Sequence, residues 1–200
     1  MNTITPSRRR WFAWSTREIL LIAAIGVVFG LLMAASLYAF AVTVAFGPVV
    51  GWAWIGFYLL PSFFVGYIMR RPASALLVAI LYSLVMLLFS PYGPLILINC
   101  AFYAVSGELA LLLGTRYRAF SLFWMIVAGI IGGAVMLVLF LIFYRDSLLG
   151  LATPVLIAVI ITTLVSGAVS SVIARLLADA VARTGALSGT PLQQAAMPEV

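Results

Sequence analysis

Few side chains in this sequence could perform acid–base or metal chemistry. The chain has five acidic residues and no histidine, and of the acids only Glu108 lies well inside an apolar stretch. A histidine-dependent catalytic triad, a zinc-activated water and a histidine proton relay therefore lack essential parts. Cys100 is the single cysteine, so it cannot form an intramolecular disulfide, and we expect it to act as a small buried hydrophobic residue. The sequence predicts no enzyme, no cofactor and no metal site.

Glu108 is the acidic residue that most needs an explanation. A carboxylate within a membrane is costly unless it is paired, hydrogen-bonded or protonated, and this makes it a candidate for substrate binding. It precedes Arg116 by eight residues, which is about 12 Å along a helix. It could therefore equally link the cytoplasmic ends of neighbouring helices. The sequence leaves both interpretations open.

A polar stripe and an aromatic group together suggest a site for a flat heteroaromatic ligand. Asn99, Tyr103 and Ser106 are spaced at i, i+4 and i+7, which places them on one face of a helix. Glu108 lies about half a turn away from Asn99, so a straight helix directs the two side chains apart. Aromatic rings stack on flat ligands. The chain concentrates such rings at Trp54, Phe57 and Tyr58, near the start of the apolar segment 50–69, and at Tyr92, in the loop that follows the segment 73–89.

The predicted ligand-binding residues combine these groups and are Trp54, Phe57, Tyr58, Tyr92, Asn99, Tyr103 and Glu108. The aromatic residues could instead form only the belt that membrane proteins place at the headgroup level. The polar stripe could likewise serve only to hydrogen-bond one helix to another.

Membrane helices are the elements that must position these residues. The sequence is 66% hydrophobic and 8% charged, whereas about a quarter of the residues of a soluble domain are charged. Glycine, proline and charged residues divide it into segments that approach the length of about 20 residues needed to cross a bilayer. We predict an all-α integral membrane protein of the cell (plasma or inner) membrane, a six-transmembrane-helix bundle. The predicted helices span residues 19–45, 50–69, 73–89, 94–114, 120–144 and 151–178.

The arginines predict the orientation of the bundle. Ten of the eleven fall in the N-terminal segment, the second and fourth connections and the C-terminal end, and only Arg145 falls on the other side. By the positive-inside rule both termini are cytoplasmic. We divide the chain into a cytoplasmic segment 1–18, a transmembrane substrate-binding domain 19–178 and a cytoplasmic tail 179–200, mobile from residue 184. Anionic membrane lipid accounts for the net charge of +6, so no nucleic-acid partner is expected.

Small residues mark places where helices can approach closely. Gly26, Gly30 and Ala34 recur every four residues in the first span, and Gly129 and Gly133 repeat the pattern in the fifth. Such ridges allow the backbone of another helix to approach. The pattern alone does not distinguish a contact within the chain from a contact with a partner subunit.

Several strings, in order along the chain, resemble the YkoE family of substrate-binding S-components of energy-coupling factor (ECF) ABC transporters. They are Arg17-Glu18-Ile19, Phe46-Gly47-Pro48, Tyr67-Ile68-Met69-Arg70-Arg71-Pro72, Ser90-Pro91-Tyr92-Gly93, Gly107-Glu108, Arg116-Tyr117-Arg118-Ala119-Phe120-Ser121-Leu122 and Thr184-Gly185-Ala186-Leu187-Ser188-Gly189. The resemblance implies capture of thiamin or its hydroxymethylpyrimidine precursor, with a transmembrane coupling subunit and two ATPase domains as partners. It also implies that small residues on the first helix, here Gly26, Gly30 and Ala34, contact the coupling subunit.

The sequence departs from the family pattern in ways that bear on the ligand. Ala79 and Met86 stand where thiamin-type members carry carboxylates, and Tyr103 stands where the family has a glutamine. Thiamin is a cation, so the loss of acids makes a neutral pyrimidine, or another small heteroaromatic compound, a serious rival. Two further functions stay open: an accessory or scaffold subunit without its own ligand, and an autonomous small-molecule carrier.

Overall fold

The computed structural model describes residues 14–185, 187 and 190–192 of the chain. These residues form six long helices, one short helix and two single 3₁₀ turns. In chain order the elements are α1 (Thr16–Thr43), η1 (Val44–Phe46), α2 (Pro48–Met69), α3 (Ser74–Phe89), η2 (Gly93–Leu95), α4 (Ile96–Gly114), α5 (Leu122–Phe143), α6 (Arg145–Leu149) and α7 (Thr153–Arg183). The all-helical fold and the order of the six predicted helices are confirmed, and α6 is an addition that the sequence did not suggest.

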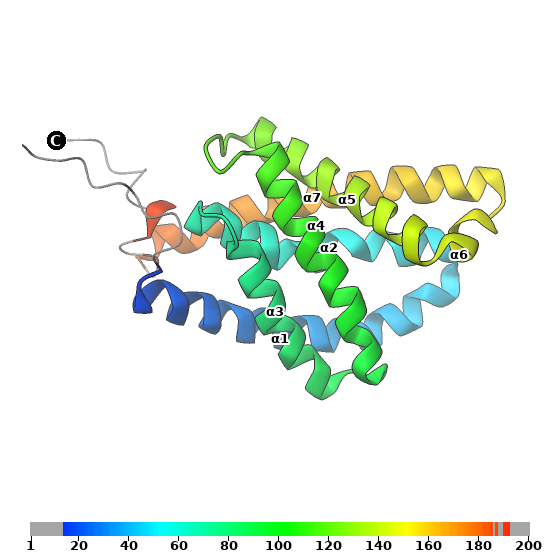
Figure 1. Ribbon diagram of the computed structural model, residues 1–200, viewed down its shortest axis with the longest axis horizontal. Helices are drawn as coiled ribbons and strands as arrows, with labels where there is room; N and C mark the ends of the chain where they lie inside the picture. Colours follow the sequence, from blue (N-terminus) through cyan, green and yellow to red (C-terminus); the bar gives the residue numbers. More distant parts are fainter. Residues whose placement is uncertain (1–13, 186, 188–189, 193–200) are drawn as a thin grey trace, which may run out of the picture.

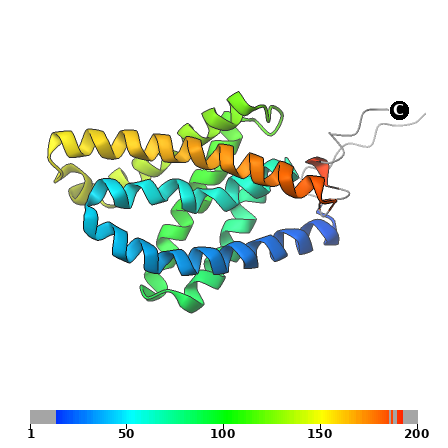
Figure 2. The ribbon, with the colours of Figure 1, turned by 180° about the vertical axis from the view of Figure 1, so that it is seen from behind.

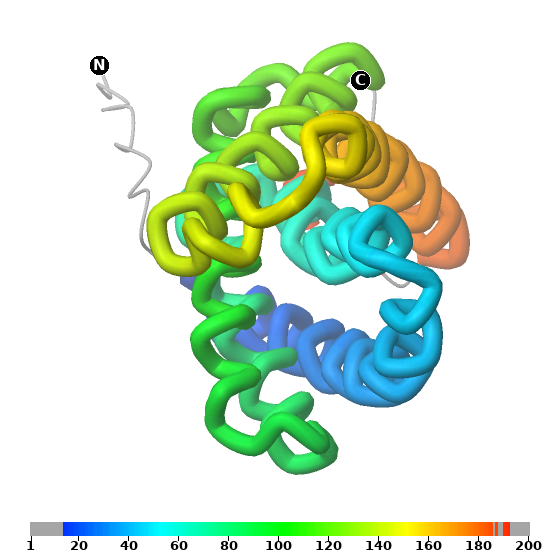
Figure 3. Tube along the Cα trace, turned by 90° about the vertical axis from the view of Figure 1, so that its right-hand side faces the viewer, coloured from blue at the N-terminus to red at the C-terminus, as the bar shows by residue number. Residues whose placement is uncertain are grey.

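Four helices run along the length of the molecule and two cross them. Figure 1 shows α1, α2, α5 and α7 roughly parallel to the long axis, with α3 and α4 steeply inclined across them. Viewed from behind and along the axis, α2 lies between α1 and α7 (Figures 2 and 3). This central position explains why α2 is buried almost without interruption from Ile55 to Met69.

Both ends of the described chain lie at the same end of the bundle (Figure 1). Because the helices alternate in direction, the arginine-bearing connections after α2 and α4 lie there too. Five helices are long and apolar enough to cross a membrane, and α3, with 16 residues, is the shorter sixth. This arrangement agrees with the arginine distribution that predicts a common cytoplasmic side.

Glycines bring α7 into near backbone contact with both α2 and α5. A Cβ atom added to Gly56 would lie 2.1 Å from the carbonyl oxygen of Ser166, whose hydroxyl accepts a hydrogen bond from the Gly56 N–H at 3.0 Å. A Cβ added to Gly129 would lie 2.4 Å from the Gly167 carbonyl oxygen. The ridge predicted in the fifth span therefore packs helices within the chain.

The ridge on α1 requires a correction. A Cβ added to Gly26 would lie 2.8 Å from Leu81 Cβ, and one added to Gly30 would lie 2.6 Å from Val85 Cβ. Gly26, Gly30 and Ala34 are all buried, because α3 of the same chain covers this face of α1. A partner subunit cannot reach these residues in this arrangement, so the predicted docking surface is replaced by an internal contact.

The C-terminal region also differs from expectation. Helix α7 continues to Arg183, and beyond it Leu187, Thr190 and Leu192 are buried. Leu187 and Leu192 belong to the hydrophobic core, so the predicted mobile tail is packed at these positions. Residues 186, 188–189 and 193–200 of the tail, and residues 1–13 of the predicted N-terminal segment, lie outside the described residues.

Candidate ligand-binding site

A cavity of about 420 Å³ opens at the end of the bundle opposite the chain termini. Its size lies within the range of about 300–1,000 Å³ that is usual for small-molecule sites. The cavity is formed where five parts of the chain meet: the C-terminal part of α1, the first half of α2, the C-terminal part of α3, the η2 connection with α4, and the end of α5 with α6. The lining residues are Leu37, Phe40, Val44, Pro48, Gly51, Trp52, Trp54, Ile55, Tyr58, Met86, Tyr92, Ile96, Asn99, Tyr103, Phe140, Tyr144, Ser147 and Leu148.

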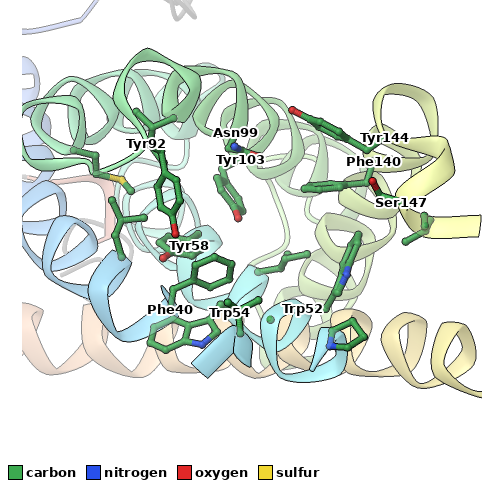
Figure 4. A pocket seen from close by; sticks show the side chains of 18 residues that line it. Phe40, Trp52, Trp54, Tyr58, Tyr92, Asn99, Tyr103, Phe140, Tyr144 and Ser147 are labelled. Carbon is green, nitrogen blue, oxygen red and sulfur yellow. The ribbon is translucent and has the colours of Figure 1, made fainter. Parts of the chain in front are cut away.

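Aromatic rings from α2 and α4 form a continuous wall on one side of this cavity (Figure 4). The rings of Trp54 and Tyr58 are tilted with centroids 6.3 Å apart, and those of Tyr58 and Tyr103 are 5.2 Å apart. Trp54 is fixed by its indole N–H, which donates to Thr43 Oγ1 at 2.8 Å. The wall is therefore held in place before any ligand arrives, which reduces the entropy lost on binding.

Polar groups on α4 are available to a ligand. Asn99 and Tyr103 lie one helical turn apart and both line the cavity, as their spacing predicts. Within the described part of the chain neither the Asn99 carboxamide nor the Tyr103 hydroxyl has a hydrogen-bond partner. The Tyr58 hydroxyl, by contrast, already accepts a hydrogen bond from Ser36 Oγ at 3.4 Å. Asn99 and Tyr103 can therefore orient a bound ring by hydrogen bonds.

The lining of the cavity is electrically neutral. Its eighteen residues include no aspartate, glutamate, lysine or arginine. Met86 lies in this wall, whereas Ala79 is buried elsewhere in α3. The site therefore offers a ligand aromatic faces, one amide and hydroxyl groups rather than an ion pair.

Two of the predicted binding residues lie elsewhere. Phe57 lines a separate, open groove between α1 and α2, although its ring also packs on Trp54 at 5.5 Å. Glu108 lies towards the other end of the bundle, where its Oε1 accepts the Ala73 N–H at 2.6 Å and its Oε2 accepts the Leu76 N–H at 3.3 Å. The other five predicted residues, Trp54, Tyr58, Tyr92, Asn99 and Tyr103, meet around the cavity.

Glu108, on α4, connects its helix by hydrogen bonds to the start of α3 and to the connection after α4, at the arginine-rich end of the bundle. Besides the two amides at the start of α3, it accepts a hydrogen bond from the Tyr117 hydroxyl in the connection that follows α4. Burial raises the pKa of Tyr117, and the neighbouring Glu108 carboxylate raises it further, so the phenol stays protonated and donates. A carboxylate at a helix N-terminus also interacts favourably with the helix dipole. These contacts match the helix-linking interpretation of Glu108.

Several cavity residues were not among those predicted from the sequence. Phe40, Trp52, Phe140, Tyr144 and Ser147 all face the cavity in Figure 4. These residues lie at or next to the outer ends of the first, second and fifth spans. Because alternating helices bring these ends to one side of the membrane, the sequence could have indicated them as candidates for the cavity lining. Which of them converge depends on the inclination of the helices, and the sequence pattern does not contain this information.

Comparison with known proteins identifies the kind of molecule that carries this cavity. Residues 17–135, more than half of the chain, match the family described as ABC-type cobalt transport system, permease component. The chain belongs to this family. The permease is also 27% identical over 182 residues to YkoE of Bacillus subtilis (strain 168), described as an HMP/thiamine permease protein, with 90% of each chain covered.

A solved structure supports the same assignment for the fold. The crystal structure of an S-component of an ECF transporter superposes with a TM-score of 0.80 at 26% identity, covering 91% of the permease and 92% of that chain. The resemblance to YkoE-type S-components, the multi-pass plasma-membrane location and the expectation of a transporter rather than an enzyme are thereby confirmed. The permease is a substrate-binding subunit of a membrane transport system.

Proposed function

We propose that the permease captures a small neutral heteroaromatic compound, best represented by hydroxymethylpyrimidine (HMP), for an ATP-driven importer. The observation that carries this proposal is the neutral aromatic cavity on the side of the bundle opposite the arginine-rich end. YkoE, whose description names HMP and thiamine, gives independent support for a pyrimidine ligand. Cobalt, which the family description names, would favour a set of imidazole, thiolate or carboxylate ligands, whereas this cavity offers rings, an amide and hydroxyls.

The chemistry of an aminopyrimidine suits the groups on α4. Its exocyclic amine donates and the adjacent ring nitrogen accepts, which is the arrangement that an asparagine carboxamide pairs with in recognising adenine. Asn99 can supply this two-bond contact, and the Tyr103 hydroxyl can bond to the hydroxymethyl group. The wall of Trp54, Tyr58 and Tyr103 supplies stacking, at about 0.5–1.5 kcal/mol for each ring pair beyond the area buried.

Thiamin fits less well because it carries a fixed positive charge. Aromatic faces attract cations, by about 0.5–2 kcal/mol each, but moving the charge out of water requires more than this when no carboxylate is near. Met86 occupies the cavity wall where a carboxylate would compensate the charge. We therefore expect HMP to bind more tightly than thiamin.

We further propose that a transmembrane coupling subunit, which works with two ATPase domains, docks against the groove between α1 and α2. Small residues border this groove on both helices, with Ala35 and Ala39 exposed one turn apart on α1 and Ala53 exposed on α2. A partner helix can approach closely over such residues. Trp54 lines both the groove and the cavity, so one side chain would contact the ligand on one face and the partner on the other.

The first test is to identify the bound compound. Mass spectrometry of small molecules that co-purify with the detergent-solubilised permease should detect HMP or a related base, and tryptophan quenching should then show tighter binding of HMP than of thiamin. Asn99→Ala should weaken HMP binding about tenfold, since one to two hydrogen bonds at about 1 kcal/mol each are lost. Ser106→Ala is the matched control, because Ser106 lies on the same helix but is buried away from the cavity.

Other outcomes would favour the alternative functions. An intact protein that shows no co-purified molecule and no quenching with either compound would indicate an accessory or scaffold subunit. Uptake by liposomes that contain only the permease, without ATP, would indicate an autonomous carrier.

A further inference from the structure

Two arginines from different helices converge on one tyrosine ring at the end of the bundle opposite the cavity. The guanidinium carbon of Arg70, at the end of α2, lies 5.5 Å from the centre of the Tyr67 ring and 5.1 Å from that of Phe120. The guanidinium carbon of Arg175, on α7, lies 6.0 Å from the same Tyr67 ring. Ring faces thus hold both cations in position between α2, α7 and the start of α5.

Among the described residues, the cluster contains one carboxylate for its two cations. Asp179 is the acid in contact: its Oδ1 accepts the Tyr67 hydroxyl at 2.9 Å, and its Oδ2 lies 3.7 Å from Arg175 Nε. Arg70 Nε and Arg175 Nη1 are buried without a hydrogen-bond acceptor among the described residues. Buried donors of charged groups are costly to leave unpaired, so the cluster lacks an acceptor.

A phosphate group has the chemistry that this cluster lacks. Guanidinium groups bind phosphate through paired N–H donors, and an arginine that is already stacked on a ring loses little further freedom on binding. Both side chains are partly exposed, with 26% of the Arg175 side chain accessible, so an anion can reach their outer N–H groups, whereas Arg70 Nε and Arg175 Nη1 are themselves shielded. The cluster also lies at the end where the arginines of the chain gather, next to the headgroups of a membrane leaflet that is rich in anionic lipid.

We propose that Arg70 and Arg175 together bind the phosphate of an anionic phospholipid headgroup between α2 and α7. Occupation of this site would link the two helices at one end and supply negative charge to the accessible N–H groups of both guanidiniums. Other arginines at this end serve as a comparison: Arg71 is paired with Glu18 at 3.1 Å, and Arg118 is exposed.

The test uses the full-length permease in a neutral detergent, with native mass spectrometry and thermal melting. Phosphatidylglycerol should be retained at least tenfold more than phosphatidylcholine and should raise the melting temperature. The double variant Arg70→Gln/Arg175→Gln should lose both effects, and Arg118→Gln, the control for charge at the same end, should keep them. Because Arg70→Lys and Arg175→Lys keep the charge and disturb the fold less, a loss of selective retention in these variants would also support the site.

Four results would overturn the proposal, three with the permease alone and one with a partner subunit. One is equal retention of both lipids by the wild-type protein, and another is an equal loss in Arg118→Gln. The third is a rise in melting temperature with inorganic phosphate alone that equals the rise with phosphatidylglycerol, because it would indicate a site for free phosphate. Protection that appears only when a partner subunit is added, and not with lipid, would assign the cluster to an acidic protein partner instead.

Discussion

Replacing Glu108 should separate the two roles that its position allows. The structure shows three hydrogen bonds to this carboxylate, from the backbone N–H groups of Ala73 and Leu76 and from the Tyr117 hydroxyl. Glu108 does not line the cavity. We therefore expect Glu108→Ala to lower the stability of the permease and to leave its affinity for ligand unchanged.

The size of the effect follows from the bonds that are lost. Hydrogen bonds to a charged group contribute about 1.5–3 kcal/mol each, and loss of a helix cap costs about 1 kcal/mol. Glu108 is only half-buried, so water can replace part of these contacts, and we expect a total loss of about 3 kcal/mol. For a chain of this length that corresponds to a fall of about 6–12 °C in melting temperature. Tyr117→Phe removes one bond of the three and should cost about 1 kcal/mol.

The assay combines thermal melting, followed by tryptophan emission, with quenching titrations of HMP at a temperature where every variant is folded. Asp146→Asn provides the stability control, since it neutralises an exposed carboxylate in α6. If Glu108→Ala abolished HMP binding while its melting temperature matched the wild type, the helix-linking role argued from these hydrogen bonds would be refuted.

The remaining predictions concern packing and ligand choice. Gly30→Leu should force α1 away from Val85 on α3 and lower the melting temperature by about 6–12 °C, which corresponds to about 3 kcal/mol. A normal melting temperature would show that this face of α1 is free. Gly56→Ala places a Cβ against the Ser166 carbonyl, so size-exclusion chromatography should show aggregation rather than a single species. Met86→Glu should shift the ratio of thiamin to HMP affinity, measured by quenching, at least tenfold towards thiamin.

Helix positions could be predicted well because local chemistry determines them. Glycine, proline and charge interrupt helices, and in the structure α2 begins at Pro48 and ends before Arg70, while α3 ends before Ser90. Spacing on one helix was equally informative. Asn99 and Tyr103 share a cavity because they share a face of α4.

Contacts between helices could not be predicted, because hydropathy and spacing do not define inclination. The ridge of Gly26 and Gly30 indicates that something approaches closely, but only the fold shows that it is α3. Glu108 has the same ambiguity, since two of its partners are backbone amides at the start of α3, of which the Ala73 N–H lies 35 residues earlier in the chain. Phe140 joins the cavity for a reason of the same kind: α5 returns to the side where α2 begins.

The short, inclined α3 has a consequence for the surrounding bilayer. Its 16 residues span about 24 Å, which is less than the hydrocarbon thickness of about 30 Å even without inclination. Lipid beside α3 must therefore thin, at a cost of a fraction of a kcal/mol for each Å of mismatch, while α1 and α7, with 28 and 31 residues, exceed that thickness and must tilt or extend beyond it. The permease should thus deform its membrane unequally around its circumference.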